Sequence, residues 1–335
     1  MLRWAAVDDA PATAESRSID EHAELLERIV TELSRVIRGK KSFLRQLVSA
    51  LVAGGHVLID DVPGLGKTTV AKTLALLIGT DETRHEPVAF RRIQFTPDLL
   101  PYDITGVDVF DPKTREFVFT PGPVFANVVL ADEINRSTPK VQSALLEVMA
   151  EHQVTVGNRT HLMDDLFLVM GTQNPVEIEG TYPLPLAQVD RFLMRLHIGY
   201  PDPEVELDIL SSNPSQSVMP LITPVCARSD ILAARAAAEN LYCDEQLLRA
   251  VVDIATATRE HGAVEYGVSP RGSLMLLAAA RSYALVRGRP YVVDQDIVDL
   301  AAPVLAHRIK LRDTSVDPRE LVDEVARGRI ERIHR

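Results

Sequence analysis

The sequence has few cysteines and no long apolar segment. The first shortage argues against a zinc site and the second against a membrane-spanning protein. Only Cys226 and Cys243 occur among 335 residues, too few and too far apart for a zinc site, so we expect structural thiols in a reducing compartment. The longest wholly apolar run, Leu274 to Ala280, is far shorter than the roughly 18 residues of a membrane span. Asp8 and Asp9 stand where a signal peptide needs apolar residues. We therefore expect a cytoplasmic protein, not an integral membrane protein, with a mobile tail over residues 1–18.

Basic residues are also in deficit. Lys and Arg number 36 against 47 Asp and Glu, which gives a formal net charge of -11. A net negative protein repels phosphate backbones, so no nucleic-acid partner is expected. A local basic groove is compatible with that total, and a nucleic-acid-associated function stays as the alternative. Apolar residues make up 46% and charged residues 25%, an ordinary globular composition, and the length favours about two domains.

Strand and helix patterns alternate over the first 200 residues. Buried strands are predicted at His56–Asp60, Arg92–Phe95, Asn127–Ala131 and Leu166–Gly171, and helices at Ile19–Val36, Phe43–Val52, Thr68–Ile78 and Pro139–Glu151. Alternation of this kind predicts an α/β fold with a parallel sheet covered on both faces. After Tyr200 the pattern is almost wholly helical. A boundary near Pro201 is therefore predicted, with a core over residues 19–200 and a helical domain over residues 201–335.

Two short hairpins interrupt the predicted core. VDVF (Val107–Phe110) and EFVF (Glu116–Phe119) flank the turn DPKTR, and VTV (Val154–Val156) precedes the turn pair Gly157-Asn158. Each hairpin could close an edge of the sheet or project toward a partner or a pore. The sequence favours neither arrangement.

A phosphate-binding loop is predicted between the first strand and the helix that follows it. Its residues are Pro63, Gly64, Leu65, Gly66, Lys67, Thr68 and Thr69. The glycines let backbone N–H groups approach phosphate, and the helix directs its positive end to the same place. Lys67 would neutralise the β- and γ-phosphates of ATP, and the Thr68 hydroxyl would hold Mg²⁺. The first consensus position is Asp61 instead of glycine, and we expect its side chain to point away from the nucleotide and stabilise the turn.

Two further segments place polar residues at predicted strand ends. VVLADEINR ends in Asp132, a candidate ligand of Mg²⁺ or its water shell, and Glu133, a candidate activator of water. The alternative is a pair of helix N-cap acids, because the next helix begins at Ser137-Thr138-Pro139. In GTQNP, Asn174 could orient a water beside the γ-phosphate. By itself that segment would be read as a simple turn.

Arg191 in QVDRF and Arg271 in GVSPRGSL are the candidate cations. Ser269 is a predicted N-cap and Pro270 a first-turn residue, so Arg271 lies near the positive end of a helix. That place is unfavourable for a cation unless an anion is close. A nucleotide phosphate could be the anion. A solvated arginine or a salt bridge to the other domain is equally consistent with the residues.

The order of these motifs resembles that of the MoxR family of AAA+ ATPases. The phosphate loop, DEINR, GTQNP, GTYPLPLAQVDRF and YGVSPR follow one another, and the likeness extends from Val36 to the HRI at His307–Ile309. The resemblance implies an AAA+ P-loop NTPase core with a parallel sheet and two inserted β-hairpins, followed by an all-helical lid domain. It also implies a homo-oligomeric ring, usually a hexamer, with ATP bound between subunits.

The resemblance also carries roles for single residues. Lys67, Thr68, Asp132, Glu133 and Asn174 match the nucleotide and hydrolysis motifs of one subunit. Arg271 matches the lid arginine that touches phosphate. Arg191 matches the arginine finger that reaches the neighbour's nucleotide, with Arg136 a weaker candidate. Leu186 stands where the family usually has glutamate, so no carboxylate partner for Arg191 is carried over there.

The expected function is that of a Mg²⁺-dependent ATPase that drives chaperone-like remodelling or maturation of partner proteins. The resemblance suggests a protein adaptor with a von Willebrand A domain and protein clients. A nucleotide-gated scaffold conflicts with the intact Asp132, Glu133 and Asn174. A small P-loop kinase leaves Arg191, Arg271 and the helical region unexplained.

Overall fold

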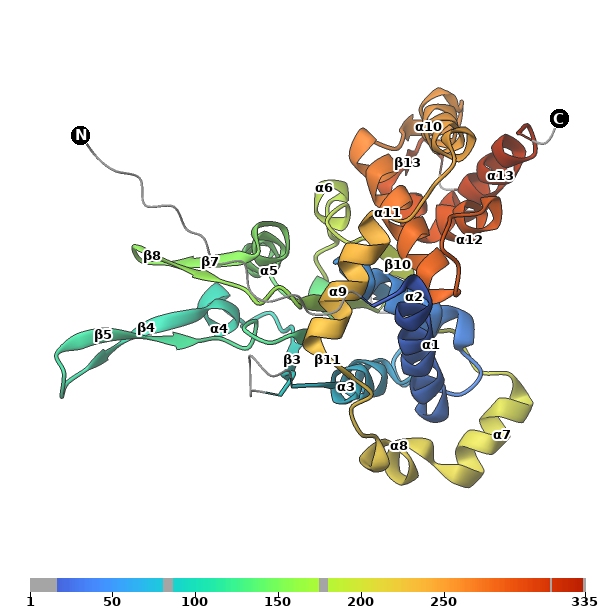
Figure 1. Ribbon diagram of the computed structural model, residues 1–335. Helices are drawn as coiled ribbons and strands as arrows, with labels where there is room; N and C mark the ends of the chain where they lie inside the picture. Colours follow the sequence, from blue (N-terminus) through green and yellow to red (C-terminus); the bar gives the residue numbers. More distant parts are fainter. Residues whose placement is uncertain (1–16, 81–86, 175–179, 314, 334–335) are drawn as a thin grey trace, which may run out of the picture.

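A computed structural model describes residues 17–80, 87–174, 180–313 and 315–333, and nearly all of the predicted tail lies outside them. Its centre is a five-stranded sheet in the order β10-β1-β9-β6-β3 (Figure 1). The strands are β1 (Val57–Asp60), β3 (Phe90–Gln94), β6 (Val128–Asp132), β9 (Leu168–Gln173) and β10 (Met194–Leu196). Every neighbouring pair is parallel. The predicted parallel sheet is therefore confirmed.

Successive residues of the central strands enter different apolar clusters. Val57 and Ile59 pack with the first helices of the chain, whereas Leu58 packs in a second cluster on the opposite face. Side chains of a strand alternate between its two faces, so this division shows that the sheet is covered on both sides. The continuous apolar runs of β1 and β6 follow from that double coverage.

Helices cover both faces and continue the chain after the sheet. The longer ones in the first 200 residues are α1 (Ile19–Val36), α2 (Lys41–Val52), α3 (Lys67–Leu77) and α5 (Pro139–Glu151), with the short α4 (Pro101–Thr105), η1 (Ile134–Arg136) and α6 (Leu186–Val189). Ser18 and Glu21 form a capping box that starts α1: the Glu21 N–H donates to Ser18 Oγ at 3.2 Å and the Ser18 N–H to Glu21 Oε2 at 2.6 Å. The apolar residues of α5 pack on the face that receives Leu58.

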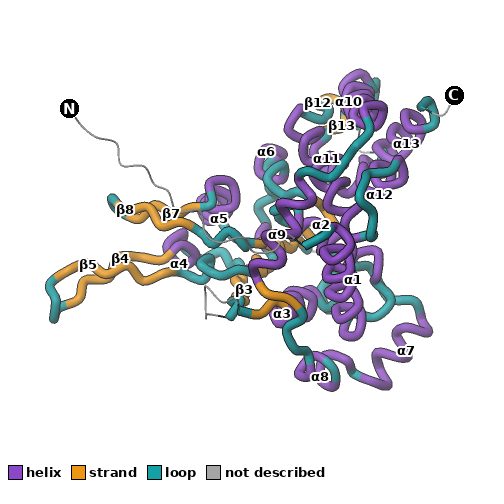
Figure 2. The backbone as a smooth tube through the Cα atoms, in the orientation of Figure 1, coloured by secondary structure: helices purple, strands orange, loops and turns teal. Residues whose placement is uncertain are grey.

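The two predicted hairpins are separate two-stranded sheets, not edges of the central one. They comprise β4 (Gly106–Asp111) with β5 (Glu116–Pro121), and β7 (Gln153–Val156) with β8 (Arg159–Leu162). Figures 1 and 2 show both projecting on the same side of the molecule. Phe119 and His161 stack across them with ring centroids 3.7 Å apart. The interpretation as sheet edges is therefore wrong.

The region after Tyr200 is mostly helical, as the sequence predicts. Its helices are α7 (Pro203–Ser212), α8 (Pro214–Ser217), η2 (Met219–Leu221), α9 (Arg228–Glu239), α10 (Glu245–Glu260), α11 (Pro270–Val286), α12 (Asp294–Leu305), η3 (Ala306–Arg308) and α13 (Pro318–Ile330). Three short strands also occur, and the sequence did not indicate them: β12 (Val264–Tyr266) pairs with β13 (Lys310–Leu311), and β11 (Cys226–Ala227) pairs with β2 (Ile78–Gly79).

The C-terminal helices are packed against the sheet-bearing part of the chain. Leu276 and Leu300 belong to the same apolar cluster as Val57 and Ile59. Cys226 and Cys243 are buried free thiols. In the described part of the chain, no helix combines the length and the apolarity that crossing a membrane requires.

His56, just before β1, is a buried histidine with both ring nitrogens engaged. The Val169 N–H donates to its Nδ1 at 3.1 Å, and its Nε2 lies 3.2 Å from the Met149 carbonyl oxygen. These partners require a neutral ring with the proton on Nε2. Burial lowers the pKa of His56 to about 4, and burial also holds the pKa of His307 well below its ordinary value.

We predict that acid destabilises the fold through His56. Between pH 6.5 and about 4 the unfolded state binds the proton and the folded state does not, so the free energy of unfolding falls as pH falls through this window. The loss attributable to His56 is at most about 3 kcal/mol. Urea unfolding of His56→Gln across this window should show a shallower pH dependence, because the amide supplies one donor and one acceptor without titrating.

The exposed His261 provides the control. His261→Gln removes a histidine without touching the buried site, so its profile should follow that of the parent. Parallel profiles for His56→Gln and the parent would contradict this account of His56.

Candidate nucleotide site

Most of the predicted functional residues lie at the carboxyl ends of the strands in the central sheet. The register pairs Asp60 with Gln173, Ala131 with Gly171, and Gln94 with Asp132, so β1, β9, β6 and β3 end almost level. Ligands of open parallel sheets bind outside the carboxyl ends of the strands. The loop after Asp60 and the carboxylates of Asp132 and Glu133 therefore lie at the same end of the sheet.

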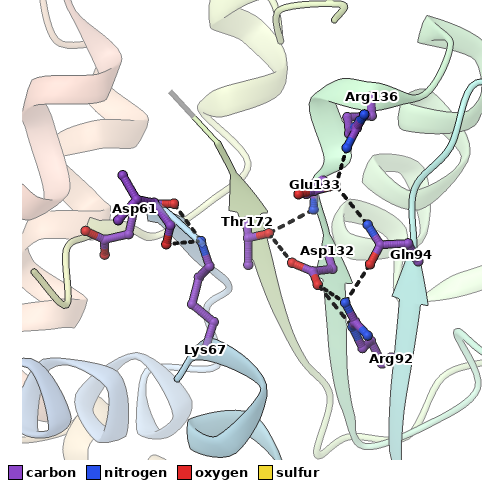
Figure 3. Close-up of polar contacts among 9 residues, drawn as sticks. Asp61, Lys67, Arg92, Gln94, Asp132, Glu133, Arg136 and Thr172 are labelled. Atoms are coloured by element: carbon purple, nitrogen blue, oxygen red, sulfur yellow. Dashed lines mark hydrogen bonds and ion pairs between the residues drawn. The ribbon is translucent and has the colours of Figure 1, made fainter. Parts of the chain in front are cut away.

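The loop after β1 has the backbone that phosphate binding requires. Gly64 and Gly66 have φ values of +90° and +84°, a region that side chains with a Cβ rarely adopt. Helix α3 begins at Lys67, and no side chain caps its first turn, so its N–H groups are available to an anion. The Lys67 Nζ donates to the backbone oxygens of Asp61 at 2.6 Å and Val62 at 3.3 Å (Figure 3). The ammonium group thus lies over the loop.

The side chain of Asp61 binds backbone N–H groups outside the phosphate loop. The Ile198 N–H donates to its Oδ2 at 2.5 Å and the Gly199 N–H to its Oδ1 at 3.3 Å. The carboxylate is buried and holds the start of the loop to the segment after β10. Its hydrogen-bond partners lie in the segment after the neighbouring strand β10 and not in its own turn, and the expectation that its side chain points away from nucleotide stays a prediction.

A cavity of 430 Å³ adjoins the loop. Its lining includes Pro63, Gly64, Leu65, Gly66 and Thr69, together with Ile37, Ile198, Gly199, Tyr200 and residues of α7 and α8. Cavities that hold small ligands are about 300–1,000 Å³ and mainly apolar. The volume is therefore that of a small-ligand site. Because Asp61 binds Ile198 and Gly199, it also holds two walls of the cavity, the loop and the Ile198–Gly199 segment, in place relative to each other.

Asp132 ends β6 inside a network of charged and polar groups. The Thr172 hydroxyl donates to Asp132 Oδ1 at 2.6 Å. Arg92 on β3 donates to Asp132 Oδ2 from Nε at 3.0 Å and from Nη2 at 2.6 Å. Asp132 is thus a buried strand-end carboxylate and not a helix cap. The next residue, Glu133, precedes η1 and its side chain makes no capping hydrogen bond.

Glu133 is held in an uncommon backbone conformation. Its φ is +57°, which costs a non-glycine residue roughly 1–2 kcal/mol and concentrates at functional sites. The Glu133 N–H donates to the Thr172 hydroxyl at 2.8 Å. Its Oε2 accepts from Gln94 Nε2 at 2.9 Å and from Arg136 Nη1 at 3.1 Å (Figure 3). Thr172 therefore fixes Asp132 and Glu133 together, and Arg136 is paired with Glu133.

The remaining predicted residues of this edge have simpler surroundings. Thr68 lies exposed in the first turn of α3. Asn174 directly follows β9 and is buried, while Pro175 of the same motif lies outside the described residues. The Thr68 hydroxyl and the Asp132 carboxylate are oxygen donors of the type that Mg²⁺ prefers, and Mg²⁺ usually takes only one or two protein ligands besides phosphate and water. In the described ranges there is no cluster of three or more His, Cys, Asp or Glu residues suited to a metal.

Arg191 and Arg271 lie together, but not with the phosphate loop. Both line a second cavity with Gly54, Gly55, His56, Met149 and Leu193, and the two cavities share no lining residue. Gly54 to His56 precede β1 and the loop follows it. The two cavities therefore lie at opposite ends of the strands, the first at their carboxyl ends and the second at their amino ends. The four residues of β1 separate these ends by roughly 13 Å.

The contacts of the two arginines differ. A guanidinium nitrogen of Arg191 donates to the Leu146 carbonyl on α5. Arg271 has 52% of its side chain exposed, and its Nη1 lies 3.9 Å from Asp190 Oδ2. Ser269 caps α11, accepting from the Gly272 N–H at 3.4 Å, as the sequence predicts. Arg271 is thus half exposed and within ion-pair distance of the preceding part of the chain, and its contact with a nucleotide phosphate stays a prediction.

Sequence reasoning missed Arg92, Gln94 and Thr172. The two consecutive arginines in the strand FRRIQ could have indicated a functional residue, because a strand of a covered sheet rarely carries exposed charged side chains. Thr172 is in the GTQNP segment, where Asn174 alone was considered. Their roles depend on the register of β3, β6 and β9, which a single sequence does not specify.

Comparisons with known proteins agree with this architecture. Residues 56–194 match the family described as ATPase family associated with various cellular activities (AAA). Residues 256–327 match an AAA lid domain. A crystal structure of a candidate ATPase from Cytophaga hutchinsonii superposes with a TM-score of 0.83 at 37% identity, covering 92% of this chain and 95% of that one.

Curated relatives extend the likeness along most of the chain. Uncharacterized protein YeaC of Bacillus subtilis is 48% identical, over 86% of this chain and 87% of its own. Chaperone MoxR1 of Mycobacterium tuberculosis is 44% identical, over 90% of this chain and 79% of its own. Protein MoxR of Methylorubrum extorquens is 31% identical, over 85% of this chain and 87% of its own.

We predict that Asp61 supports the fold and does not repel phosphate. In Asp61→Gly, the N–H groups of Ile198 and Gly199 lose a charged acceptor, so the free energy of unfolding should fall by about 1–3 kcal/mol. Affinity for a fluorescent ATP analogue should stay within a few-fold of the parent. Asp61→Asn, which keeps one acceptor oxygen, should lie between them in stability. A large gain in affinity in either variant would show that the carboxylate had opposed the nucleotide.

Proposed function

Because the chain belongs to the MoxR family of AAA+ ATPases, we propose that it hydrolyses ATP with Mg²⁺ at a site shared between subunits and thereby remodels partner proteins. The observation that carries the proposal is the placement of the phosphate loop and the two arginines at opposite edges of one sheet.

The loop Pro63 to Thr69 binds the phosphates in this proposal. Gly64 and Gly66 bring N–H groups to the oxygens, and Lys67 leaves the carbonyl oxygens of Asp61 and Val62 for the β- and γ-phosphates. Thr68 and Asp132 would hold Mg²⁺, which would neutralise charge on the phosphate oxygens. Arg92 donates to Asp132 Oδ2 and Thr172 to Oδ1, so Thr172 would keep the carboxylate oriented for the metal.

Glu133 is the general base for the attacking water, and Asn174 orients that water. Glu133 follows Asp132 directly, and its carboxylate projects at the carboxyl edge toward Gln94 and Arg136. In this role the carboxylate accepts a proton from the water, while Gln94 and Arg136, which both donate to Oε2, hold its orientation.

Arg191 and Arg271 act on the nucleotide of a neighbouring subunit. An arginine side chain cannot cover the roughly 13 Å between the two edges of its own sheet, whereas a cyclic arrangement places one subunit's second cavity against the next subunit's loop. Arg191 stabilises charge that develops on the transferred phosphoryl group. Arg271, half exposed beside Asp190, reaches the same phosphates from the lid. The ring is proposed to be a hexamer.

Remodelling of other proteins is the biological output that we propose. One relative is named a chaperone, and the paired hairpins project from the body of the subunit, where a client could meet them. An adaptor with a von Willebrand A domain is the partner that the family suggests. Movement of the lid during each ATP cycle would transmit force to the client.

We predict that the catalytic residues complement one another in mixed rings. Glu133→Gln and Arg191→Ala should each lack turnover while still binding ATP. After the two variants are mixed and reassembled, about one interface in four combines an intact base with an intact neighbouring arginine. Steady-state ATP hydrolysis should therefore reappear on mixing. Full activity of either single variant would remove that residue from the mechanism, and no recovery on mixing would contradict the shared site.

We also predict that Glu133→Gln with ATP traps clients. Affinity purification in ATP should recover partner proteins that the parent releases during turnover, and Lys67→Ala should fail to retain them because it cannot hold the triphosphate. Identical recoveries from all three proteins would contradict ATP-driven remodelling. Stimulation of the parent ATPase by DNA would favour the nucleic-acid alternative.

A further inference from the structure

Arg308, in η3 of the lid, is a buried arginine turned toward the segment that carries Arg191. Only 2% of its side chain is exposed. Its Nη2 donates to the backbone oxygens of Asp190 at 3.2 Å and Phe192 at 2.5 Å, and its Nη1 to that of Leu193 at 3.2 Å. Three carbonyl groups of one four-residue stretch are therefore bound by one guanidinium.

A charge pair completes this contact. The Arg308 Nε lies 2.9 Å from Asp190 Oδ1. Burial lowers the pKa of Arg308 to about 10, so the side chain remains charged at neutral pH. Removing the Asp190 carboxylate would leave the buried Arg308 guanidinium without its counter-charge. Arg308 therefore binds the Asp190–Leu193 stretch through three carbonyl groups and one carboxylate.

The same stretch presents Arg191 on its other side. Arg191 lines the second cavity and its guanidinium reaches Leu146 on α5. The positions on either side of it, Asp190 and Phe192, are fixed to the lid through Arg308. The backbone of Arg191 is thus set by the lid of its own subunit.

Asp190 divides its carboxylate between two lid arginines. Oδ1 faces the buried Arg308 at 2.9 Å, and Oδ2 faces the half-exposed Arg271 at 3.9 Å. A half-exposed pair at that distance contributes little to stability. Arg271 can therefore leave Asp190 for a phosphate at small cost, while Arg308 keeps Asp190 in place.

We propose that Arg308 and Asp190 form a joint that positions Arg191, so that the lid of one subunit sets the arginine offered to the next subunit's nucleotide. Arg308 is a positioning residue in this scheme, because it acts through Arg191 and touches no nucleotide. The proposal rests on the shared site proposed above. It gives lid movement after hydrolysis in one subunit a direct route to the adjacent active site.

The test separates a defect in the neighbour's site from a defect in the variant's own site. Arg308→Gln alone should lower kcat by tenfold or more, since a misplacement of about 1 Å can cost roughly a hundredfold. KM and binding of a fluorescent ATP analogue should stay near the parent values. Mixed with Glu133→Gln, it should recover turnover as Arg191→Ala does, because the Glu133→Gln subunits supply correctly positioned arginines. Arg308→Lys, which keeps the charge, should retain part of the activity.

Arg289 offers a matched control elsewhere in the lid. It binds the buried Asp296 through Nη1 at 2.7 Å and Nη2 at 2.5 Å. Among the described residues, no hydrogen bond or ion pair joins Arg289 to the Asp190–Leu193 stretch. Arg289→Gln should lower the melting temperature without lowering kcat. If Arg308→Gln does not fold, Asp190→Asn is measured instead, with the same expected recovery on mixing.

The outcomes distinguish this joint from the proposed shared site. If Arg191→Ala recovers with Glu133→Gln but neither Arg308→Gln nor Asp190→Asn does, the joint is overturned and the shared site stands. Unchanged kcat in Arg308→Gln, or an equal loss in Arg289→Gln, would also overturn it. If Arg191→Ala itself fails to recover, the shared site fails and the joint fails with it.

Discussion

Parallel pairing of β1 with β9 on one side and β10 on the other is the constraint on which the candidate site depends. It puts the loop after β1 level with Asp132 and Glu133, and it places Gly54 to His56 beside the segment that precedes β10. One edge of the sheet thereby carries the phosphate loop and the acidic residues, and the opposite edge carries Arg191. In the proposed function these are the two halves of an ATPase site, and they face in opposite directions along the strands.

The short β10 joins these halves. After it, the N–H groups of Ile198 and Gly199 bind Asp61 and so hold the loop cavity. Before it, the Asp190–Leu193 stretch binds Arg308 of the lid. A change in lid position can therefore alter the cavity that Arg191 lines, through the stretch before β10. The cavity at the phosphate loop stays fixed to the segment after β10 through Asp61. Coupling of this kind needs no long relay, because a three-residue strand separates the two contacts.

Local patterns in the sequence predicted the main strands and helices well. Apolar runs marked β1, β6 and β9, glycine and lysine marked the loop, and Ser269 marked the start of α11, because each signal is confined to a few neighbouring residues. The contacts of Asp61 and Arg308 could not be predicted, since their partners lie 137 and 115–118 residues away. The role of Arg92 could not be predicted for the same reason, because only the register of β3 against β6 brings it to Asp132. The catalytic roles of the individual residues remain predictions.

The most direct test of a site divided between subunits is the ATPase rate per subunit as the protein is diluted, with particle mass measured in the same samples. We predict that turnover per subunit falls in step with dissociation of the ring, while a fluorescent ATP analogue still binds the separated subunits through the Gly64–Thr68 loop. Turnover that stays constant per subunit after the particles have become monomers would contradict the account.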